Sequence, residues 1–429
     1  MRKLTIQIEL NGVQEVVGEI FGRAADDAVF QYSESYLANP EHPAISISLP
    51  LQKEAFTSAK TRCFFDGLLP EGYTRHSLAQ FIRTEENDYL SILETLGKEC
   101  LGAIKINCDA NTMEYVPVTE EELKKLAEEG TSASLDMITK AHLSLTGASG
   151  KVGLYLERNS GKWYLPIGEA PSTHIVKQSH IRLKSIVTNE QLSLMTAEYL
   201  GIDVPKSFII NTGSGNDEDV LLATQRYDRL MAADSKMIGM HHVPLRLHQE
   251  DFAQALGIAN YDKYENNTNQ NYMKRSFELL KEYSFDPIAD EMKLWERIVF
   301  NYLIGNTDGH LKNISLLYSK DMKKIRLAPA YDIVCTSMYE SCTKDMAFAI
   351  GGDLKLDMIK RSSFERASKQ TGLSVSAAMR HFDRMVYEFP KALRKASSEL
   401  EKLGYSGTEK MRMEIMHFGG VAYQGNHDC

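Results

Sequence analysis

A short segment near residue 310 concentrates residue types that could transfer a phosphoryl group. From Asp308 to Asn313 the sequence reads Asp-Gly-His-Leu-Lys-Asn, and a second carboxylate follows at Asp332. Phosphoryl transfer from ATP needs a carboxylate that accepts the proton of the attacking hydroxyl, and an Asn and an Asp that hold magnesium on the phosphates. The Asp-x-x-x-x-Asn spacing is the one at which such enzymes carry the base and the metal-binding amide. The pattern favours a base at Asp308 and magnesium ligands at Asn313 and Asp332.

Two further polar side chains lie inside this segment. His310 could brace the loop through hydrogen bonds, and Lys312 could neutralise charge on the phosphoryl group during transfer. We do not expect His310 to bind the metal ion, because magnesium prefers oxygen ligands. Two other interpretations remain open. Asn306 to His310 could be a turn held by Asx-type hydrogen bonds, and Asp332 could cap a helix.

A glycine-containing segment, Ser144-Leu-Thr-Gly-Ala-Ser-Gly-Lys151, precedes a predicted strand. Its glycines would let backbone amides approach phosphate oxygens, although an ordinary turn is the alternative. The segment is not a Walker P-loop, which needs Gly at position 145 and Ser or Thr at position 152, where this chain has Leu145 and Val152. The candidate nucleotide-binding residues here are Gly147, Ala148, Ser149, Gly150 and Lys151.

A Lys at the end of a predicted strand is the next candidate. Period-two alternation places Thr173, Ile175 and Lys177 on one face of the strand. A Lys with apolar neighbours inside a cleft suits the α- and β-phosphates of ATP, whereas a surface Lys on an edge strand is equally compatible with the pattern. Glu190 or Glu198 on the following predicted helix could pair with this Lys, and the sequence does not choose between them.

The junction Gln225-Arg226-Tyr227 follows an apolar strand and leads into a charged turn. Such a junction could connect two lobes and offer backbone groups to an adenine ring. The alternative is a plain strand end followed by Arg–Asp pairing at the surface.

The elements that must position these residues change in kind along the chain. Strands are predicted at 4–10, 16–21, 28–32, 44–49, 152–157, 162–165, 173–177, 207–210 and 220–224, with a hairpin turn at Asn11-Gly12. Helices are predicted at 88–96, 119–129, 189–200, 292–303, 358–371, 374–389 and 392–403. The helix at 292–303 carries an apolar stripe and delivers the chain directly into Asn306 and Asp308.

This order predicts an α+β chain with a two-lobed protein-kinase-like fold. A small β-rich lobe would precede a large helical lobe, and an extra β-rich subdomain would stand before both. We place the N-terminal subdomain at residues 1–137, the small ATP-binding lobe at 138–250 and the helical catalytic lobe at 251–429.

Bulk properties exclude several classes of protein. The chain has 429 residues, 43% hydrophobic and 25% charged, which is typical of a globular protein. No apolar run approaches the roughly 20 residues that span a bilayer, and the first residues alternate as a strand does. The six Cys form no Cys-x-x-Cys pair, so we expect reduced thiols and a cytoplasmic protein. A net charge of −9 argues against nonspecific binding to nucleic acid.

Taken together, these motifs resemble the HipA family of toxin kinases, which are Ser/Thr kinases with a phosphatidylinositol-kinase-like fold. The resemblance covers nearly the whole chain. Its carriers are 64–72 (Phe-Phe-Asp-Gly-Leu-Leu-Pro-Glu-Gly), 144–151, 173–177, 225–229 (Gln-Arg-Tyr-Asp-Arg), 249–252 (Gln-Glu-Asp-Phe) with Gly257, 306–313 and 327–332 (Leu-Ala-Pro-Ala-Tyr-Asp).

The resemblance implies roles for these residues. Asp308 would be the catalytic base, Asn313 and Asp332 would hold Mg2+, and Lys177 would contact the ATP phosphates. The hinge would run from Gln225 through Arg226 to Tyr227. Autophosphorylation would fall on Ser144 or on Thr146, two residues later. In family members, phosphorylation of the Ser that matches Ser144 switches the kinase off.

Partners follow from the same resemblance. Family members are restrained by a helix-turn-helix antitoxin and reach DNA only through it, and aminoacyl-tRNA synthetases are among their protein substrates. A kinase for a lipid or small molecule, and a non-catalytic co-repressor that binds ATP, remain the two alternatives.

Overall fold

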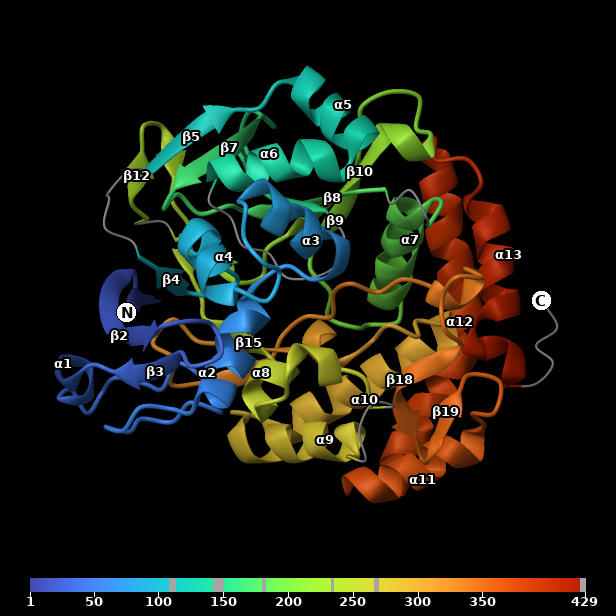
Figure 1. Ribbon diagram of the computed structural model, residues 1–429. Coiled ribbons are helices and arrows are strands. Elements are labelled where there is room, and N and C mark those ends of the chain that lie inside the picture. Colours follow the sequence, from blue (N-terminus) through green and yellow to red (C-terminus); the bar gives the residue numbers. More distant parts are fainter. Residues whose placement is uncertain (108–112, 142–149, 180–182, 233–234, 266–269, 425–429) are drawn as a thin grey trace. The chain divides into compact units, whose positions relative to one another are not determined.

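The computed structural model describes residues 1–429 except 108–112, 142–149, 180–182, 233–234, 266–269 and 425–429 (Figure 1). The chain forms two compact units. The first unit comprises Met1–Gln178, Ala223–Asn260 and Leu316–Lys324, and the second comprises Ser179–Leu222, Tyr261–Ser315 and Ile325–Cys429.

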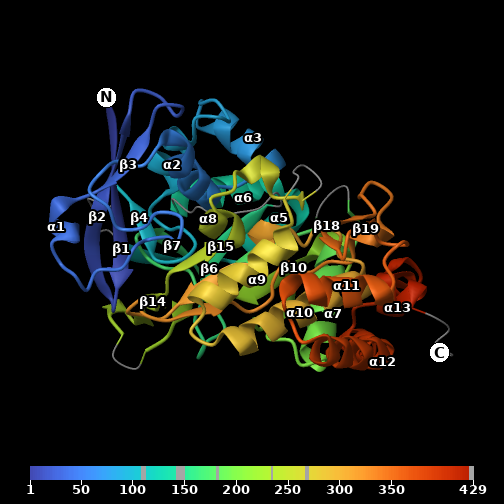
Figure 2. The ribbon, with the colours of Figure 1, turned by 90° about the horizontal axis from the view of Figure 1, so that it is seen from below.

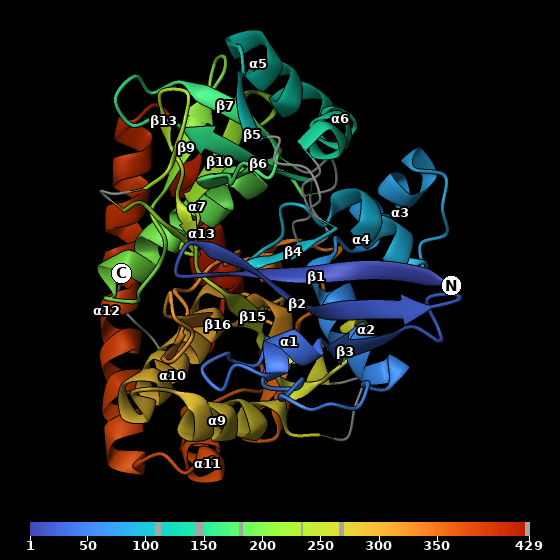
Figure 3. The ribbon, with the colours of Figure 1, turned by 90° about the vertical axis from the view of Figure 1, so that its left-hand side faces the viewer.

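The first unit begins with a four-stranded sheet in the order β3-β2-β1-β4. Its strands are β1 (Arg2–Leu10), β2 (Val13–Gly22), β3 (Val29–Tyr32) and β4 (Ile104–Ile106). Strands β1 and β2 run side by side as the predicted hairpin (Figure 3). Asn11 and Gly12 have φ angles of 51° and 80°, as a tight hairpin turn requires. The strand predicted at 44–49 is wrong, because only an isolated bridge joins Ser46 to Leu49.

Short helices lie between β3 and β4 in the chain. They are α1 (Glu34–Leu37), α2 (Ser58–Phe65), η1 (Asp66–Leu68), α3 (Gly72–Phe81) and α4 (Tyr89–Leu96). The side chain of Asp88 caps α4 at its predicted start. The rings of Phe30, Phe56 and Phe65 pack together and are almost fully buried.

The second sheet of the first unit runs in the order β5-β7-β6-β8-β10. Its strands are β5 (Met113–Pro117), β6 (Lys151–Leu156), β7 (Trp163–Gly168), β8 (His174–Gln178) and β10 (Val220–Gln225), whose last residues lie in this unit. Helices α5 (Glu120–Glu129) and α6 (Thr131–Ala141) follow β5, and α6 packs on β6 and β7. The capping box between Thr119 and Glu122, typical of a helix start, is present on α5.

The remaining elements of the first unit are short. They are β11 (Arg229–Leu230), β12 (Met237–Ile238), β13 (His241–His242), β14 (Leu245–Arg246), β15 (Gln249–Asp251), α8 (Phe252–Leu256) and η3 (Asn260–Asp262), which crosses into the second unit.

The second unit is mainly helical. Its helices are α7 (Ile186–Tyr199), α9 (Tyr272–Tyr283), α10 (Pro287–Ile304), α11 (Arg361–Thr371), α12 (Val375–Lys402) and α13 (Thr408–Phe418), with 3-10 turns η2 (Asp217–Asp219), η5 (Leu311–Asn313), η6 (Thr336–Met338) and η7 (Gly420–Tyr423). Its strands are β9 (Ser207–Asn211), β17 (Ile325–Leu327), β18 (Asp345–Ile350) and β19 (Asp353–Lys355), while β16 (Ser315–Tyr318) crosses into the first unit.

Helix α10 is the central element of this unit. It contacts both α9 and α12 (Figure 2), and α12 also packs against α7. The predicted apolar stripe is confirmed, because Leu294, Ile298, Val299, Tyr302 and Leu303 are all buried. None of the helices within the described residues has the length and apolar character needed to cross a lipid bilayer.

The two helices predicted at 374–389 and 392–403 are in fact one. Helix α12 runs through Pro390 without ending. Proline removes one backbone donor, but Phe389 and Leu393 are fully buried on either side of it. The apolar face of the helix therefore continues across the proline, and packing maintains the helix.

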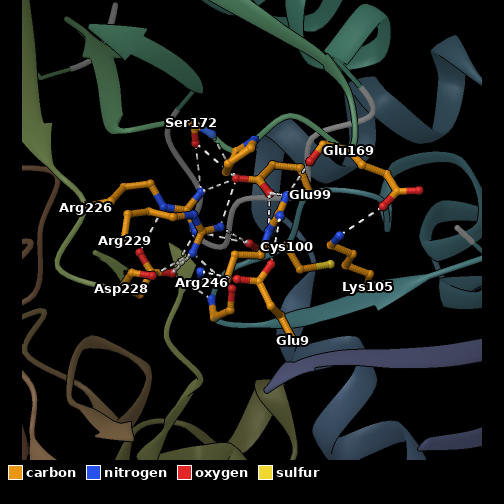
Figure 4. A network of polar contacts seen from close by, with 12 residues as sticks. Glu9, Glu99, Cys100, Lys105, Glu169, Ser172, Arg226, Asp228, Arg229 and Arg246 are labelled. Atoms are coloured by element: carbon orange, nitrogen blue, oxygen red, sulfur yellow. Dashed lines mark hydrogen bonds and ion pairs between the residues drawn. The ribbon is translucent and has the colours of Figure 1, made fainter. Parts of the chain in front are cut away.

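A buried ionic network holds the first unit together (Figure 4). Glu99, just after α4, accepts hydrogen bonds from Arg226 at 3.0 Å, Arg229 at 2.9 Å and Arg246 at 2.5 Å. Asp228 accepts from Arg226 at 2.7 Å and from Arg229 at 2.9 Å. These five side chains are 0–3% exposed. The network thus connects the segment before β4 to the segments that follow β10 and form β14.

The network changes the proton affinity of its central carboxylate. Burial alone would raise the pKa of Glu99, but attraction by Arg229, Arg246 and Arg226 outweighs burial and lowers the pKa below its ordinary value of 4.5. Because the pKa of Glu99 is lower in the folded state, its carboxylate stabilises the fold at pH values above its unfolded-state pKa. That contribution is lost as the pH falls through the folded-state pKa.

We predict that Glu99→Gln lowers the free energy of unfolding by about 3–5 kcal/mol at pH 7, because buried guanidinium groups lose their shared counter-charge. Chemical denaturation of the full chain measures this change. The matched control is Glu128→Gln, which removes an exposed i,i+4 pair with Lys124 worth about 0.3–0.5 kcal/mol. The gap between wild type and Glu99→Gln should shrink as the pH falls below 4.5. Equal stability of the two variants at pH 7 would contradict the role of Glu99.

Candidate active site

The acidic segment begins where α10 ends. Gly305 terminates the helix with a φ angle of 79°, in the left-handed region that favours glycine. The backbone N–H of Asn306 then donates to the Asn301 carbonyl at 2.8 Å, and its Oδ1 accepts from the backbone N–H of Asp308 at 3.1 Å. The Asx-type turn left open as an alternative is therefore present, and it fixes the backbone at Asp308.

Hydrogen bonds inside the loop bring Asp308 and Asn313 together. The backbone N–H of His310 and the side-chain Nδ2 of Asn313 both donate to the Asp308 carbonyl, each at 2.8 Å. A carbonyl oxygen only accepts, so the amide nitrogen of Asn313 must face it. This contact orients the Asn313 side chain and leaves its Oδ1 on the opposite side of the amide.

Arg297 of α10 anchors the segments that carry Asn313 and Asp332. Its Nη2 donates to the backbone carbonyl of Asn313 and, at 3.5 Å, to that of Tyr331. The guanidinium also lies 5.4 Å from the centre of the Tyr331 ring, as a cation–π contact. The Tyr331 hydroxyl in turn donates to the Lys312 carbonyl at 3.1 Å. One buried side chain therefore sets the spacing between the loop and the second carboxylate.

Asp332 itself has an unusual backbone conformation. Its φ angle is 56°, which non-glycine residues seldom adopt and which Asp tolerates better than most. No helix begins at Asp332, since the next described turn is η6 at Thr336, so the helix-cap alternative is wrong. Thr336 contacts the loop again, because its Oγ1 accepts from the Thr307 backbone N–H at 2.7 Å.

The polar side chains of the loop differ in exposure. Asp308 is 52% exposed at its side chain, whereas His310, Lys312 and Asn313 are buried. The Nε2 of His310 lies 3.9 Å from Asp308 Oδ1. The phenol of Tyr264 donates a hydrogen bond to the same oxygen. The carboxylate proposed as the base is thus the one group of this set that solvent and a large substrate can reach.

The predicted phosphate-binding residues belong to the first unit. Lys151 and Lys177 are direct cross-strand partners on β6 and β8, so their side chains project from the same face of the sheet. Gly150 packs tightly, because a Cβ there would lie 2.0 Å from Gln178 Nε2. The other residues predicted here lie outside the described part of the chain: Ser144, Thr146, Gly147, Ala148 and Ser149.

The predicted hinge, Gln225 to Tyr227, lies at the C-terminal end of β10. The Arg226 side chain is committed to Glu99, Asp228 and the Cys100 carbonyl, and its backbone N–H donates to the Thr173 carbonyl. Arg–Asp pairing therefore does follow the strand, but it is buried rather than at the surface. Gln225 and Tyr227 are half-buried, and of the two helix carboxylates, Glu190 is buried and Glu198 is exposed.

Three residues of this description were missed from the sequence. Arg297 had a signal, since it is a charged residue inside the apolar stretch that became α10. Glu99 and Tyr264 had none, because each acts on residues remote in the sequence.

Comparison with known proteins gives consistent matches. The HipA-like C-terminal domain matches residues 143–393, and the HipA N-terminal domain matches residues 8–107. A putative kinase of Sinorhizobium fredii, Y4mE, is 31% identical across 90% of this chain and 91% of its own length. The serine/threonine-protein kinase toxin HipA of Shewanella oneidensis is 25% identical across 91% of this chain and 89% of its own length.

A solved structure shares the fold. HipA of Shewanella oneidensis MR-1, determined with HipB and its operator DNA, superposes with a TM-score of 0.79 at 23% identity, over 98% of this chain and 97% of that one. The match confirms the predicted α+β, two-lobed protein-kinase-like fold.

We predict that Gly305→Ala destabilises the second unit more than Gly372→Ala does. Both glycines end helices at nearly the same φ angle, 79° and 80°. A Cβ at 305 would lie 2.1 Å from Ser337 Oγ and 3.0 Å from Gly419 Cα, whereas a Cβ at 372 meets nothing within 4 Å. Chemical denaturation should show a loss of about 1–2 kcal/mol for the control and about 1–3 kcal/mol more at 305. Equal losses would show that the tight packing at Gly305 has no energetic weight.

Proposed function

The chain belongs to the HipA family, and on that premise we propose that it is a cytoplasmic Ser/Thr protein kinase that uses ATP and Mg2+ as the toxin of a toxin–antitoxin system. Family relatives carry the names of kinases. The observation that carries the proposal is local: the Asn313 amide is oriented by the Asp308 carbonyl, and Arg297 contacts the backbone carbonyls of Asn313 and Tyr331.

In this proposal Asp308 accepts the proton of the substrate hydroxyl. A general base must reach the proton that it removes, and the Asp308 side chain is half-exposed. His310 braces Asp308, and Lys312 neutralises charge on the transferring group. An exposed base favours a protein hydroxyl as acceptor over a small molecule enclosed in a pocket.

The residues present fit a magnesium ion. Magnesium prefers oxygen ligands, and usually takes only one or two from the protein side chains. Asn313 Oδ1 and the Asp332 carboxylate are such oxygens, and among the described residues no group of three or more His, Cys, Asp or Glu could hold a metal instead. When bound, magnesium neutralises charge on the ATP phosphates.

The nucleotide would be held from the first unit. Lys151 and Lys177 project from one face of the sheet, and two lysines on neighbouring strands favour a polyanion such as the triphosphate of ATP. The backbone of Gln225 to Tyr227 would meet the adenine. At Arg226 only the backbone carbonyl would serve this role, since its side chain is held by Glu99 and Asp228 and its N–H donates to the Thr173 carbonyl.

Partners follow from the relatives. The Shewanella HipA structure contains HipB and operator DNA, and we propose that a helix-turn-helix antitoxin likewise binds this chain and provides its contact with DNA. The chain's own charge of −9 is unsuited to direct binding of nucleic acid. An aminoacyl-tRNA synthetase is the proposed class of substrate.

The first test of this function is Asp308→Asn. The Asn side chain has the same shape as Asp but cannot accept the proton of the substrate hydroxyl. Phosphoryl transfer from radiolabelled ATP to protein should therefore fall at least about 100-fold. ATP binding, measured by calorimetry, should change less than about threefold. Asp357→Asn, an exposed position in the same unit, is the matched control.

Other outcomes would reject the proposal. Full activity of Asp308→Asn would refute the mechanism. Label found only in lipid or small-molecule extracts would favour a small-molecule kinase, and intact ATP binding without any transfer in the wild type would favour a co-repressor.

The second test concerns autophosphorylation. We predict that phosphate from ATP appears on Ser144 or Thr146, and that Ser144→Ala combined with Thr146→Val removes it. Intact-mass and peptide mass spectrometry after incubation with ATP would measure this, and phosphate found only at other residues would refute the prediction.

A further inference from the structure

The most informative unexplained contact in the second unit is the one between Tyr264 and Asp308. The phenolic hydroxyl of Tyr264 donates a hydrogen bond to Asp308 Oδ1. The Tyr264 ring meets His310 edge-on, with centroids 5.0 Å apart and planes at 86°. Tyr264 therefore contacts both the carboxylate proposed as base and the side chain proposed to brace it.

The backbone around Tyr264 is held on both sides. The N–H of Leu311 donates to the Lys263 carbonyl at 3.4 Å, and the Tyr272 hydroxyl donates to the Asp262 carbonyl at 2.6 Å. On the other side the buried carboxylate of Glu265 accepts from the backbone N–H of Tyr272 at 3.1 Å. The backbone that carries the phenol is therefore held on both sides within this unit.

The chemistry of this contact repeats that of the proposed reaction. A substrate Ser or Thr must bring a hydroxyl group to an Asp308 oxygen and donate its hydrogen there. Tyr264 already brings a hydroxyl group to Oδ1 and donates its hydrogen. A hydrogen bond to a carboxylate is stronger than one between neutral groups, so an incoming hydroxyl must compete with the phenol.

We propose that Tyr264 occupies the place of the acceptor hydroxyl at Asp308 in the resting chain, and that a substrate hydroxyl or water must displace it before phosphoryl transfer. The inference rests on the proposed function, because it takes Asp308 as the base. It adds an internal competitor for the acceptor, which reduces wasteful hydrolysis of ATP.

Tyr264→Phe is the direct test, because it removes the hydroxyl and keeps the ring beside His310. Two measurements are needed: hydrolysis of Mg·ATP, read as free phosphate, without any added protein acceptor, and the rate at which a water-soluble carbodiimide with glycine ethyl ester labels Asp308, followed by peptide mass spectrometry. Both rates should rise about three- to tenfold, the effect of losing one charge-assisted hydrogen bond at an exposed site. Tyr387→Phe, at a tyrosine 82% exposed on α12, is the control and should change neither.

The two measurements separate failure of the inference from failure of the proposed function. Faster labelling of Asp308 with no hydrolysis by either protein would support the contact and count against the kinase assignment. Hydrolysis by the wild type that is unchanged or slower in Tyr264→Phe would overturn the inference, since Tyr264 would then position the base and not compete for it. Phosphate on Tyr264 itself would also overturn it, because the phenol would then be an acceptor.

Discussion

The guanidinium group of Arg297 is the constraint on which the candidate site depends. Its Nη2 donates to the backbone carbonyl of Asn313 and to that of Tyr331, the residue before Asp332. Both contacts come from this one nitrogen, whose two hydrogens lie in the fixed plane of the guanidinium group and so hold the two acceptors in a set relation. The strained φ angle of Asp332 is maintained beside this anchor. Helix α10 thus supports both the loop that carries Asp308 and Asn313 and the segment that carries Asp332.

The first unit is organised by a second buried charge, Glu99. Three guanidinium groups surround it, and Asp228 balances two of them. Exposed ion pairs contribute little to stability, whereas breaking a buried pair leaves a charge that nothing compensates. The network therefore connects the N-terminal sheet region to the end of β10 at Arg226 through buried ion pairs. The Arg226 side chain is one of the groups that this network holds.

The sequence was sufficient to predict those features whose residues lie close together along the chain. The Asp308-to-Asn313 spacing corresponds to hydrogen bonds closed within one loop, and the stripe of α10 is a repeat along one helix. The sequence could not predict contacts that tertiary packing makes between distant residues. Arg226 and Glu99 are 127 residues apart, and Tyr264 and Asp308 are 44 residues apart. Pro390 predicted a helix break that continuous burial overrides. The Asx turn and the kinase spacing, treated as rivals, proved to be compatible.

The central claim is that Asp308 serves as the base for phosphoryl transfer to protein hydroxyls. Quantitative phosphoproteomics of cells that produce the wild-type chain or Asp308→Asn at equal levels tests it most directly. The account predicts a limited set of phosphoserine and phosphothreonine sites that appear only with the wild type. Indistinguishable phosphoproteomes from the two strains, with both proteins folded and binding ATP, would contradict it.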